Sequence, residues 1–235
     1  MCIIIAKNKT DRLPTESELK TSFTKNSDGG GFMYVDNGKV IIDKGYMNWE
    51  KFYRHYKTLC KKYHNFKGKS LVIHCRIGTS GTNSKINCHP YPISDNVNYL
   101  HKLYFKTDLG LAHNGIINEY NPTNNEKKLD INDTQNFIRK YLSPLKNEYN
   151  DFYKSEYIDK GIKSLIGWSK LALLDKDDTL TLIGNFVEDN NLSFSNTTYK
   201  EYKYNYSSNN IKEYNSYEDY INDIWNYNYN SKSIY

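Results

Sequence analysis

The chain opens with Met1-Cys2-Ile3-Ile4-Ile5-Ala6, in which three consecutive isoleucines follow a cysteine. β-Branched residues favour an extended backbone, and an uninterrupted apolar run is typical of a strand buried on both faces. We therefore expect residues 2–6 to form a strand that ties the amino end of the chain into a sheet. The Cys2 thiol would lie at the start of that strand.

Further strands and helices are predicted along the chain from its hydrophobic periodicity. Asn37-Gly38 predicts a tight turn between two strands in residues 31–43, because both residues tolerate the left-handed conformation of that turn. The other expected strands are 70–75, 110–113, 170–175 and 179–183, and the expected helices are 15–24, 48–63, 130–141 and 157–166. Strands near both ends with helices between them predict layered α and β structure.

Composition predicts one main domain followed by a tail. The chain has 235 residues, and its 38% of hydrophobic residues includes 23 tyrosines. Residues 199–235 are mostly Tyr, Asn, Ser, Lys and Glu, so the apolar core is expected from about the first 190 residues. No apolar run reaches the roughly 20 residues that span a bilayer, and no secretory signal precedes the first strand. We expect a cytoplasmic protein.

Four cysteines are present, and they show no CxxC pairing. We expect thiols and no disulfides, with Cys75 buried in the core. A tetrahedral metal site is an alternative that would draw on six side chains: His64, His74, His89, Cys60, Cys75 and Cys88. Their spacing matches no known zinc pattern, so no metal or other cofactor is expected.

Cys2 combines two reactive groups if Met1 is removed. The new amino terminus has a reference pKa near 8 and the thiol one of about 8.5, so a proton passes between them at little cost near neutral pH. Nucleophile and base would then belong to one residue. A second interpretation is that Cys2 is only a small apolar residue at the start of a strand. Taken alone, the residue leaves both open.

Asn114-Gly115 follows an expected strand directly. An Asn side-chain amide beside an unhindered Gly N–H is suited to stabilise the oxyanion that forms when an amide is attacked. The same dipeptide is also common in ordinary turns between strands. The pair therefore indicates an oxyanion hole only if other motifs of the chain support one.

These motifs together resemble the class II glutamine amidotransferases, over residues 2–197. The family has Cys after the initiator Met, as here in Met1-Cys2. Its patterns His-x-Arg-x-Ala-Thr-His-Gly, Asn-x-His-Pro, His-Asn-Gly-x-Ile and Ser-Asp-Thr-Glu are similar to residues 74–81, 87–90, 113–117 and 132–135 in turn. In style the chain is closest to small standalone members encoded by bacteriophages, which would place it in the host cytoplasm.

The resemblance implies a four-layer α-β-β-α Ntn-hydrolase sandwich, an α+β fold with two antiparallel sheets and helices outside. It makes Cys2 the nucleophile, and Asn114 and Gly115 the oxyanion hole. Arg76 and Asp133 also have ordinary interpretations. Arg76 could form a surface salt bridge, and Asp133 could be an acidic residue in the first turn of a helix. The resemblance assigns Arg76 to the α-carboxylate of glutamine and Asp133 to its α-ammonium. It also places Thr79 and Gly115 in the wall of the glutamine pocket.

Two positions depart from the family pattern within residues 74–81. Ile77 stands where several members have Trp, and Ser80 stands where they have a second His. Contacts that those side chains make to the substrate are therefore in question. The nucleophile, the oxyanion pair and the two charged residues are unaffected.

The expected function is hydrolysis of L-glutamine to glutamate and ammonia. The segment after Asn196 is too short for an ammonia-consuming domain, so we expect a separate synthetase as partner. An alternative is a freestanding hydrolase of a γ-glutamyl amide. A different class of function, nucleic-acid binding, is suggested by the formal charge of +5 and by the Tyr-rich extension 198–235, in which 217–227 could form a helix. The extension also carries acidic residues, and clustered Lys and Arg are missing, which disfavours this alternative.

Overall fold

The computed structural model of the protein describes residues 2–78 and 81–201. The chain divides into two compact units, Met1–Tyr199 and Lys200–Tyr235, and every described helix and strand belongs to the first. Thr79, Ser80 and the helix expected at 217–227 lie outside the described residues.

Two antiparallel sheets form the centre of the first unit. The larger has the strand order β10-β11-β1-β4-β2-β3-β6 and the smaller β5-β7-β8-β9. The larger sheet consists of β1 (Ile3–Lys7), β2 (Gly30–Asp36), β3 (Lys39–Tyr46), β4 (Leu71–Cys75), β6 (Tyr104–Thr107), β10 (Val187–Glu188) and β11 (Ser193–Phe194). The smaller consists of β5 (Tyr91–Pro92), β7 (Leu109–Asn114), β8 (Lys170–Asp175) and β9 (Leu180–Ile183).

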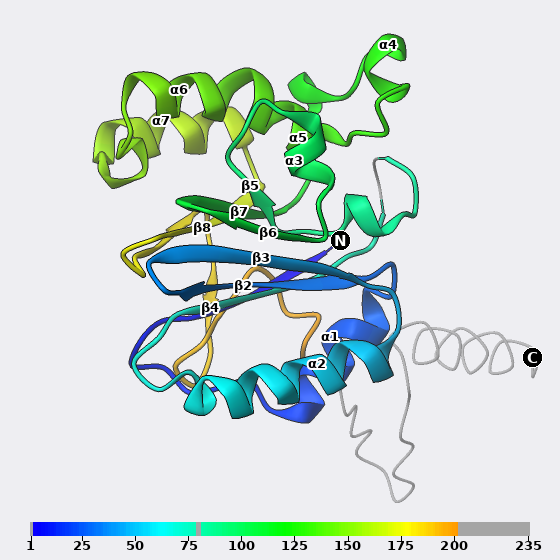
Figure 1. The fold of residues 1–235 in the computed structure, drawn as a ribbon, viewed down its shortest axis with the longest axis vertical. Coiled ribbons are helices and arrows are strands. Elements are labelled where there is room, and N and C mark those ends of the chain that lie inside the picture. The colour runs from blue at the N-terminus through cyan, green and yellow to red at the C-terminus, as the bar shows by residue number, and fades with distance from the viewer. Residues whose placement is uncertain (1, 79–80, 202–235) are drawn as a thin grey trace, which may run out of the picture. The chain divides into compact units, whose positions relative to one another are not determined.

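Helices cover the outer face of each sheet (Figure 1). Helices α1 (Glu16–Lys25) and α2 (Trp49–Lys62) lie against the larger sheet, and α5 (Asp133–Phe137), α6 (Ser143–Glu148) and α7 (Glu156–Ile166) lie on the side of the smaller one. Shorter helices are η1 (His64–Phe66), η2 (Lys85–Asn87), α3 (Val97–His101), η3 (Asn118–Tyr120), α4 (Asn124–Lys127), η4 (Ile138–Leu142) and η5 (Phe152–Lys154). The α+β class with two antiparallel sheets and helices is therefore confirmed.

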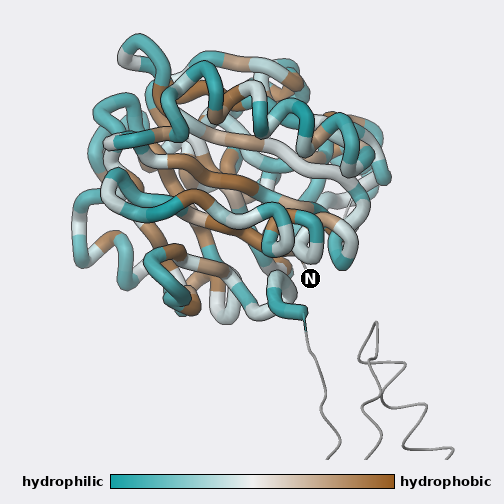
Figure 2. Tube along the Cα trace, turned by 90° about the horizontal axis from the view of Figure 1, so that it is seen from below, coloured by the Kyte–Doolittle hydropathy of each residue, from teal (hydrophilic) through white to brown (hydrophobic). Residues whose placement is uncertain are grey.

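The alternation of side chains along each strand builds three apolar layers. In β1, Ile3 and Ile5 pack toward α1 and α2, whereas Ile4 and Ala6 face the other sheet. In β8, Leu171 and Leu173 similarly belong to the layer beneath α6 and α7, while Ala172 and Leu174 face the larger sheet. Figure 2 shows the hydrophobic residues concentrated in the inner strands and hydrophilic residues in the outer turns. Because both faces of β1 are covered, its continuous apolar run is explained.

Several expected elements are confirmed by their local chemistry. Asn37 and Gly38 both have positive φ in the turn between β2 and β3, as the dipeptide predicts. The side chain of Asn48 accepts a hydrogen bond from the N–H of Lys51 and so caps α2. Thr15 and Glu18 form a capping box at α1.

Two expectations need correction. The helix expected at 130–141 begins only at Asp133, because Asn132 caps it, and it continues as the wider η4. The core also extends beyond the first 190 residues, since Phe194 is fully buried and stacks on Tyr199 with ring centroids 3.6 Å apart. Among the described residues, no helix is both long and apolar enough to cross a membrane.

Candidate functional site

Cys2 immediately precedes the first residue of β1. Ile3 pairs with Cys75, the last residue of β4, so the antiparallel register places Cys2 opposite Arg76. The Cys2 Sγ lies 3.4 Å from the backbone N of Ile77, which donates to it, and 3.3 Å from the Ile77 carbonyl oxygen. The thiol is thus fixed against the turn that follows β4.

Two residues near the carboxyl end of the first unit hold the Cys2 strand in place. Asn196 Nδ2 donates to the Cys2 carbonyl at 2.7 Å. The Ile4 N–H donates to Ser195 Oγ at 2.8 Å, and the Ser195 N–H donates to the Ile4 carbonyl at 2.9 Å. No motif marked Ser195 or Asn196 as part of a site, because only the pairing of β11 with β1 brings them there.

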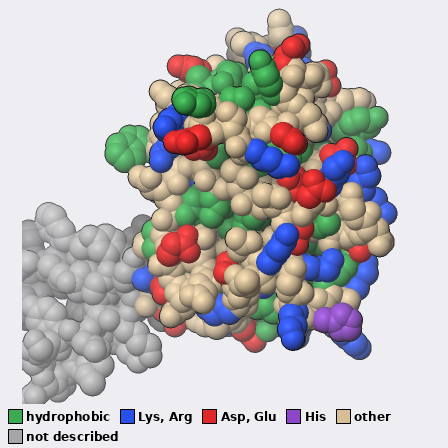
Figure 3. All heavy atoms as spheres, turned by 90° about the vertical axis from the view of Figure 1, so that its left-hand side faces the viewer, with side chains coloured by type: hydrophobic (Ala, Val, Ile, Leu, Met, Phe, Trp, Pro, Cys, Tyr) green, Lys and Arg blue, Asp and Glu red, His purple; other side chains and the backbone are tan. Residues whose placement is uncertain are grey.

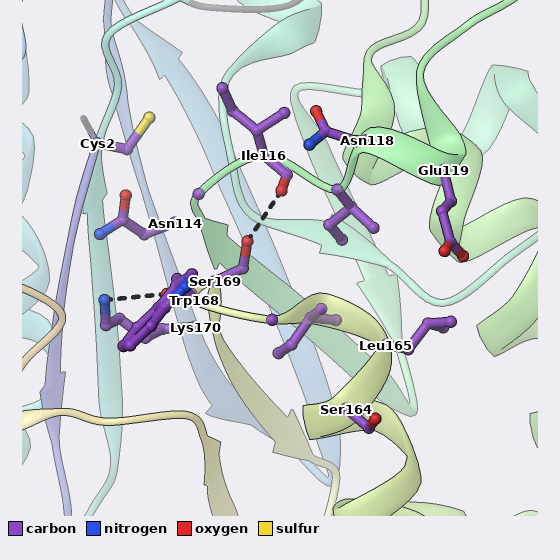
Figure 4. Close-up of a pocket in the computed structure, with 14 residues that line it drawn as sticks. Cys2, Asn114, Ile116, Asn118, Glu119, Ser164, Leu165, Trp168, Ser169 and Lys170 are labelled. Carbon is purple, nitrogen blue, oxygen red and sulfur yellow. Dashed lines mark hydrogen bonds between the residues drawn. The ribbon is translucent and has the colours of Figure 1, made fainter.

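Asn114 ends β7 and lies beside Cys2, with its amide oxygen on the side of Cys2 (Figure 4). The side chain is buried, and its Nδ2 lies 2.8 Å from Ser195 Oγ. Its Oδ1 is buried and has no hydrogen-bond partner among the described residues. A buried amide oxygen without a partner costs free energy, so this is a strained or functional position.

Gly115 has a conformation and surroundings that only glycine satisfies. Its φ is 142°, and a Cβ built on it would lie 2.9 Å from the Cα of Ser169 and closer still to the Ser169 hydroxyl. Ser169 in turn donates through Oγ to the Ile116 carbonyl at 3.3 Å. The chain after β7 is therefore fixed tightly against the residue before β8.

A cavity of about 420 Å³ opens at Cys2, a size within the range of small-molecule sites. Its lining residues are Cys2, Asn114, Gly115, Ile116, Ile117, Asn118, Glu119, Ser164, Leu165, Ile166, Gly167, Trp168, Ser169 and Lys170. Trp168 is 91% exposed and Ile116 is 48% exposed, so the mouth of the cavity carries apolar side chains in contact with solvent (Figure 4). The sequence patterns did not indicate Trp168, Ser169 or the end of α7.

Arg76 is buried directly after β4. Its Nη2 donates to the Thr82 carbonyl at 3.2 Å and its Nη1 to Asn83 Oδ1 at 3.4 Å. Asp28 holds the same turn, because it accepts hydrogen bonds from the Gly78 N–H at 2.7 Å and from Asn83 Nδ2 at 2.8 Å. The guanidinium therefore lies in a turn that is anchored at both ends.

Asp133 lies behind the wall of the cavity. It is buried at the first turn of α5, and its Oδ2 accepts from the N–H of Ile117, a lining residue, at 2.9 Å. Of the residues selected from the sequence, Cys2, Asn114 and Gly115 line one cavity. Arg76 adjoins Cys2, Asp133 adjoins the cavity wall, and Thr79 lies outside the described residues.

Burial and the groups around Cys2 shift the pKa of its thiol in opposite directions. Burial raises the pKa of the Cys2 thiol, while the hydrogen bond from the Ile77 N–H and the positive charge of Arg76 lower it. Burial has the largest effect, so the thiol form is favoured. A proton acceptor close to Sγ is then needed before Cys2 can act as a nucleophile.

Three histidines, His74, His89 and His113, are buried in the first unit. Burial lowers the pKa of His74 to about 3 and that of His113 to about 4, and it lowers the pKa of His89 well below the usual value. His74 Nε2 lies 2.9 Å from the His113 carbonyl and 2.8 Å from His89 Nδ1. Because a carbonyl only accepts, His74 carries its proton on Nε2. These rings are neutral structural groups near neutral pH.

A metal centre and a nucleic-acid-binding surface are the alternative kinds of site. Within residues 2–78 and 81–201, no group of three or more His, Cys, Asp or Glu side chains is placed to hold a metal ion. On the face drawn in Figure 3, Lys and Arg side chains lie among Asp and Glu side chains. In ion pairs such as Lys39–Asp108 and Lys140–Glu126, a carboxylate likewise neutralises the positive charge of the lysine.

Comparison of the chain with models of protein families and with curated proteins finds no match.

Proposed function

We propose that the protein is a glutamine amidohydrolase whose nucleophile is Cys2, with an Ntn-hydrolase fold. The observation that carries the proposal is the position of Cys2 at the start of a buried strand, in a cavity that it shares with Asn114 and Gly115. The order of motifs along the chain supports the same function. The products would be glutamate and ammonia.

Removal of Met1 would supply the proton acceptor that the partly buried thiol needs. The α-amine of Cys2 lies on the same residue as the thiol and has a reference pKa near 8. It would take the thiol proton as sulfur attacks the side-chain amide of glutamine, and would return it to the departing ammonia. Water would then hydrolyse the γ-glutamyl thioester and regenerate the thiol.

The oxyanion formed in the attack needs donors that are already in place. Rotating the Asn114 amide by 180° exchanges its oxygen and nitrogen with almost no change of shape. Ser195 Oγ, which accepts from Ile4, would then donate its own proton to Asn114 Oδ1. The buried oxygen gains a partner, and Nδ2 turns to the side of Cys2 as an oxyanion donor, next to Gly115.

Arg76 and Asp133 are the proposed partners of the α-carboxylate and the α-ammonium. Asp133 uses Oδ2 for Ile117, and none of the described residues donates to Oδ1, which would take the ammonium. Ile77 contacts the Cys2 thiol through its backbone N–H and carbonyl, so a change of its side chain leaves these hydrogen bonds intact. The departure from the family pattern at Ile77 therefore does not weaken the assignment of Cys2.

A covalent label tests the nucleophile directly. The full chain is incubated with 6-diazo-5-oxo-L-norleucine, a glutamine analogue, and its intact mass is measured before and after. We expect loss of Met1, a single adduct that peptide sequencing maps to Cys2, and loss of glutamine hydrolysis in the labelled protein. Cys2→Ala should take no label and should lack activity.

Cys60→Ala is the matched control, since Cys60 is a buried thiol in α2 that lies outside the Cys2 cavity. It should label and turn over like the unchanged protein. Retention of Met1, or an adduct on another residue, would contradict the proposal. A glutaminase rate that rises when a synthetase is added would identify an ammonia donor, and a constant rate would favour a freestanding hydrolase.

A further inference from the structure

A second cavity, of about 390 Å³, lies at the end of β3 beside α2. Its lining residues are Gly45, Tyr46, Met47, Asn48, Lys51, Arg54, His55, Thr58 and Lys85, and none of them is acidic. Its volume is within the range of small-molecule sites. Cys2, Asn114 and Gly115 do not line it, so its role is separate from the proposed hydrolysis.

Three of the residues that line the cavity are cationic, and all three are exposed. Lys51 and Arg54 come from α2 and Lys85 from η2. In the described part of the chain, none of the three forms an ion pair with Asp or Glu. Lys39 and Lys140, by contrast, each pair with a carboxylate. Like charges around one hollow repel one another unless an anion compensates them.

His55 forms a fixed part of the wall. Its Nε2 lies 2.7 Å from Asp43 Oδ2, and Asp43 Oδ1 accepts from the Tyr46 hydroxyl at 2.7 Å. The His55 ring also stacks on Tyr46, with centroids 4.7 Å apart and planes at 22°. Asp43 is buried behind the wall with both oxygens used, so it does not fill the place of an anion in the cavity.

Close packing brings the third cation to the cavity. Gly45 has a φ of +94°, and a Cβ built on it would lie 3.2 Å from the Cβ of Lys85. Glycine therefore allows η2 to approach β3 closely enough for Lys85 to stand opposite α2. The three cations are thus brought together by the tertiary structure, across more than thirty intervening residues between Lys51 and Lys85.

We propose that this cavity binds the phosphate group of a small organic phosphate. A phosphate carries up to two negative charges and accepts several hydrogen bonds, which matches one guanidinium and two ammonium groups. One phosphate ion would occupy only part of the volume, so the remaining space beside Tyr46 and Met47 takes the organic part of the ligand. The proposal does not depend on the chemistry of Cys2.

Calorimetric titration of the full chain tests the site. The probes are AMP, ribose 5-phosphate and glycerol 3-phosphate, compared with inorganic phosphate and with adenosine, at one fixed ionic strength because charge attraction depends on salt. We expect at least one organic phosphate to bind more tightly than inorganic phosphate, and adenosine not to bind. Lys51→Gln combined with Arg54→Gln should weaken that binding at least about tenfold, since two of three cations are lost.

Lys57→Gln combined with Lys61→Gln is the matched control, because it removes the same charge from exposed positions of α2 outside the cavity. It should change the dissociation constant by less than about twofold. Equal weakening by both double variants would show general charge attraction and overturn the site. Binding of inorganic phosphate alone, or of none of the probes, would overturn the proposed ligand class.

Discussion

Asn114 illustrates how one side chain depends on a second that is distant in sequence. In the structure Asn114 Nδ2 lies 2.8 Å from Ser195 Oγ, and only after the proposed rotation of the amide would Oδ1 accept from Ser195 and Nδ2 donate toward Cys2. Ser195 also accepts from Ile4, so one hydroxyl contacts both the Cys2 strand and the proposed oxyanion donor. In the proposed reaction it would be a positioning residue, since it would act through Asn114.

Ser195→Ala should therefore lower kcat about tenfold and leave KM nearly unchanged, because loosening an oxyanion donor costs less than removing it. Steady-state glutamine hydrolysis measures both constants. Ser193→Ala is the matched control, since its hydroxyl contacts Glu188 and not the site. Equal kcat values for the two variants would remove Ser195 from the proposed mechanism.

Gly115→Ala should lower the free energy of unfolding by about 3 kcal/mol or more. A positive φ costs an L-residue about 1–2 kcal/mol, and overlap with the Ser169 backbone adds the rest. Gly68→Ala separates the two effects, since Gly68 has a φ of +68° with no atom within 4 Å of an added Cβ. Urea denaturation should show a loss of only about 1–2 kcal/mol there. Similar losses at both positions would disprove the overlap.

At the scale of single elements, α7 contains one residue that weakens it. Gly161 lies in the interior of this helix and is exposed, and a Cβ added there meets nothing within 4 Å. Glycine in a helix costs backbone entropy relative to alanine. The cavity at Cys2 includes the last residues of α7, so the stability of this helix bears on the site.

Gly161→Ala should raise the free energy of unfolding by about 0.5–1 kcal/mol, and denaturant titration would detect this. Gly38→Ala is the comparison, because its added Cβ is equally uncrowded but its φ is +67°. That variant should be destabilised. A loss of stability in Gly161→Ala as well would contradict the expectation that alanine stabilises α7 at this position.

For the whole molecule, three buried histidines make stability depend on pH. His74, His89 and His113 are neutral in the folded protein, with pKa values of about 3 for His74 and about 4 for His113. In the unfolded chain each has a pKa near 6.5. Below that pH the unfolded state binds more protons, so acidification favours unfolding.

The free energy of unfolding should therefore fall between about pH 6.5 and pH 4, approaching a slope of about 1.4 kcal/mol per pH unit for each of the three histidines. Urea denaturation at several pH values measures that slope. His89→Gln should make it shallower, since it removes one of the three groups. A flat profile over this range would contradict the buried neutral state of the three rings.

Local patterns were sufficient to predict most of the longer elements. The β2–β3 turn, the cap of α2 and the apolar run of β1 depend on neighbouring residues, so the sequence expresses them directly. The short strands β5, β6, β10 and β11 were not predicted, because so few positions seldom show a period, whereas the equally short β9 was predicted together with β8. Their pairing depends on the strands beside them.

The sequence by itself determined the strand at Cys2, the α+β class and the positions of Cys2, Asn114 and Gly115 at the ends of strands. Only the tertiary structure decided that Ser195 and Asn196 hold the Cys2 strand, and that Lys85 lies at one cavity with Lys51. The physical reason is that strand and turn preferences act between neighbours in the chain. Contacts between distant residues arise from the register of the strands and the packing of the two sheets, which no local pattern encodes.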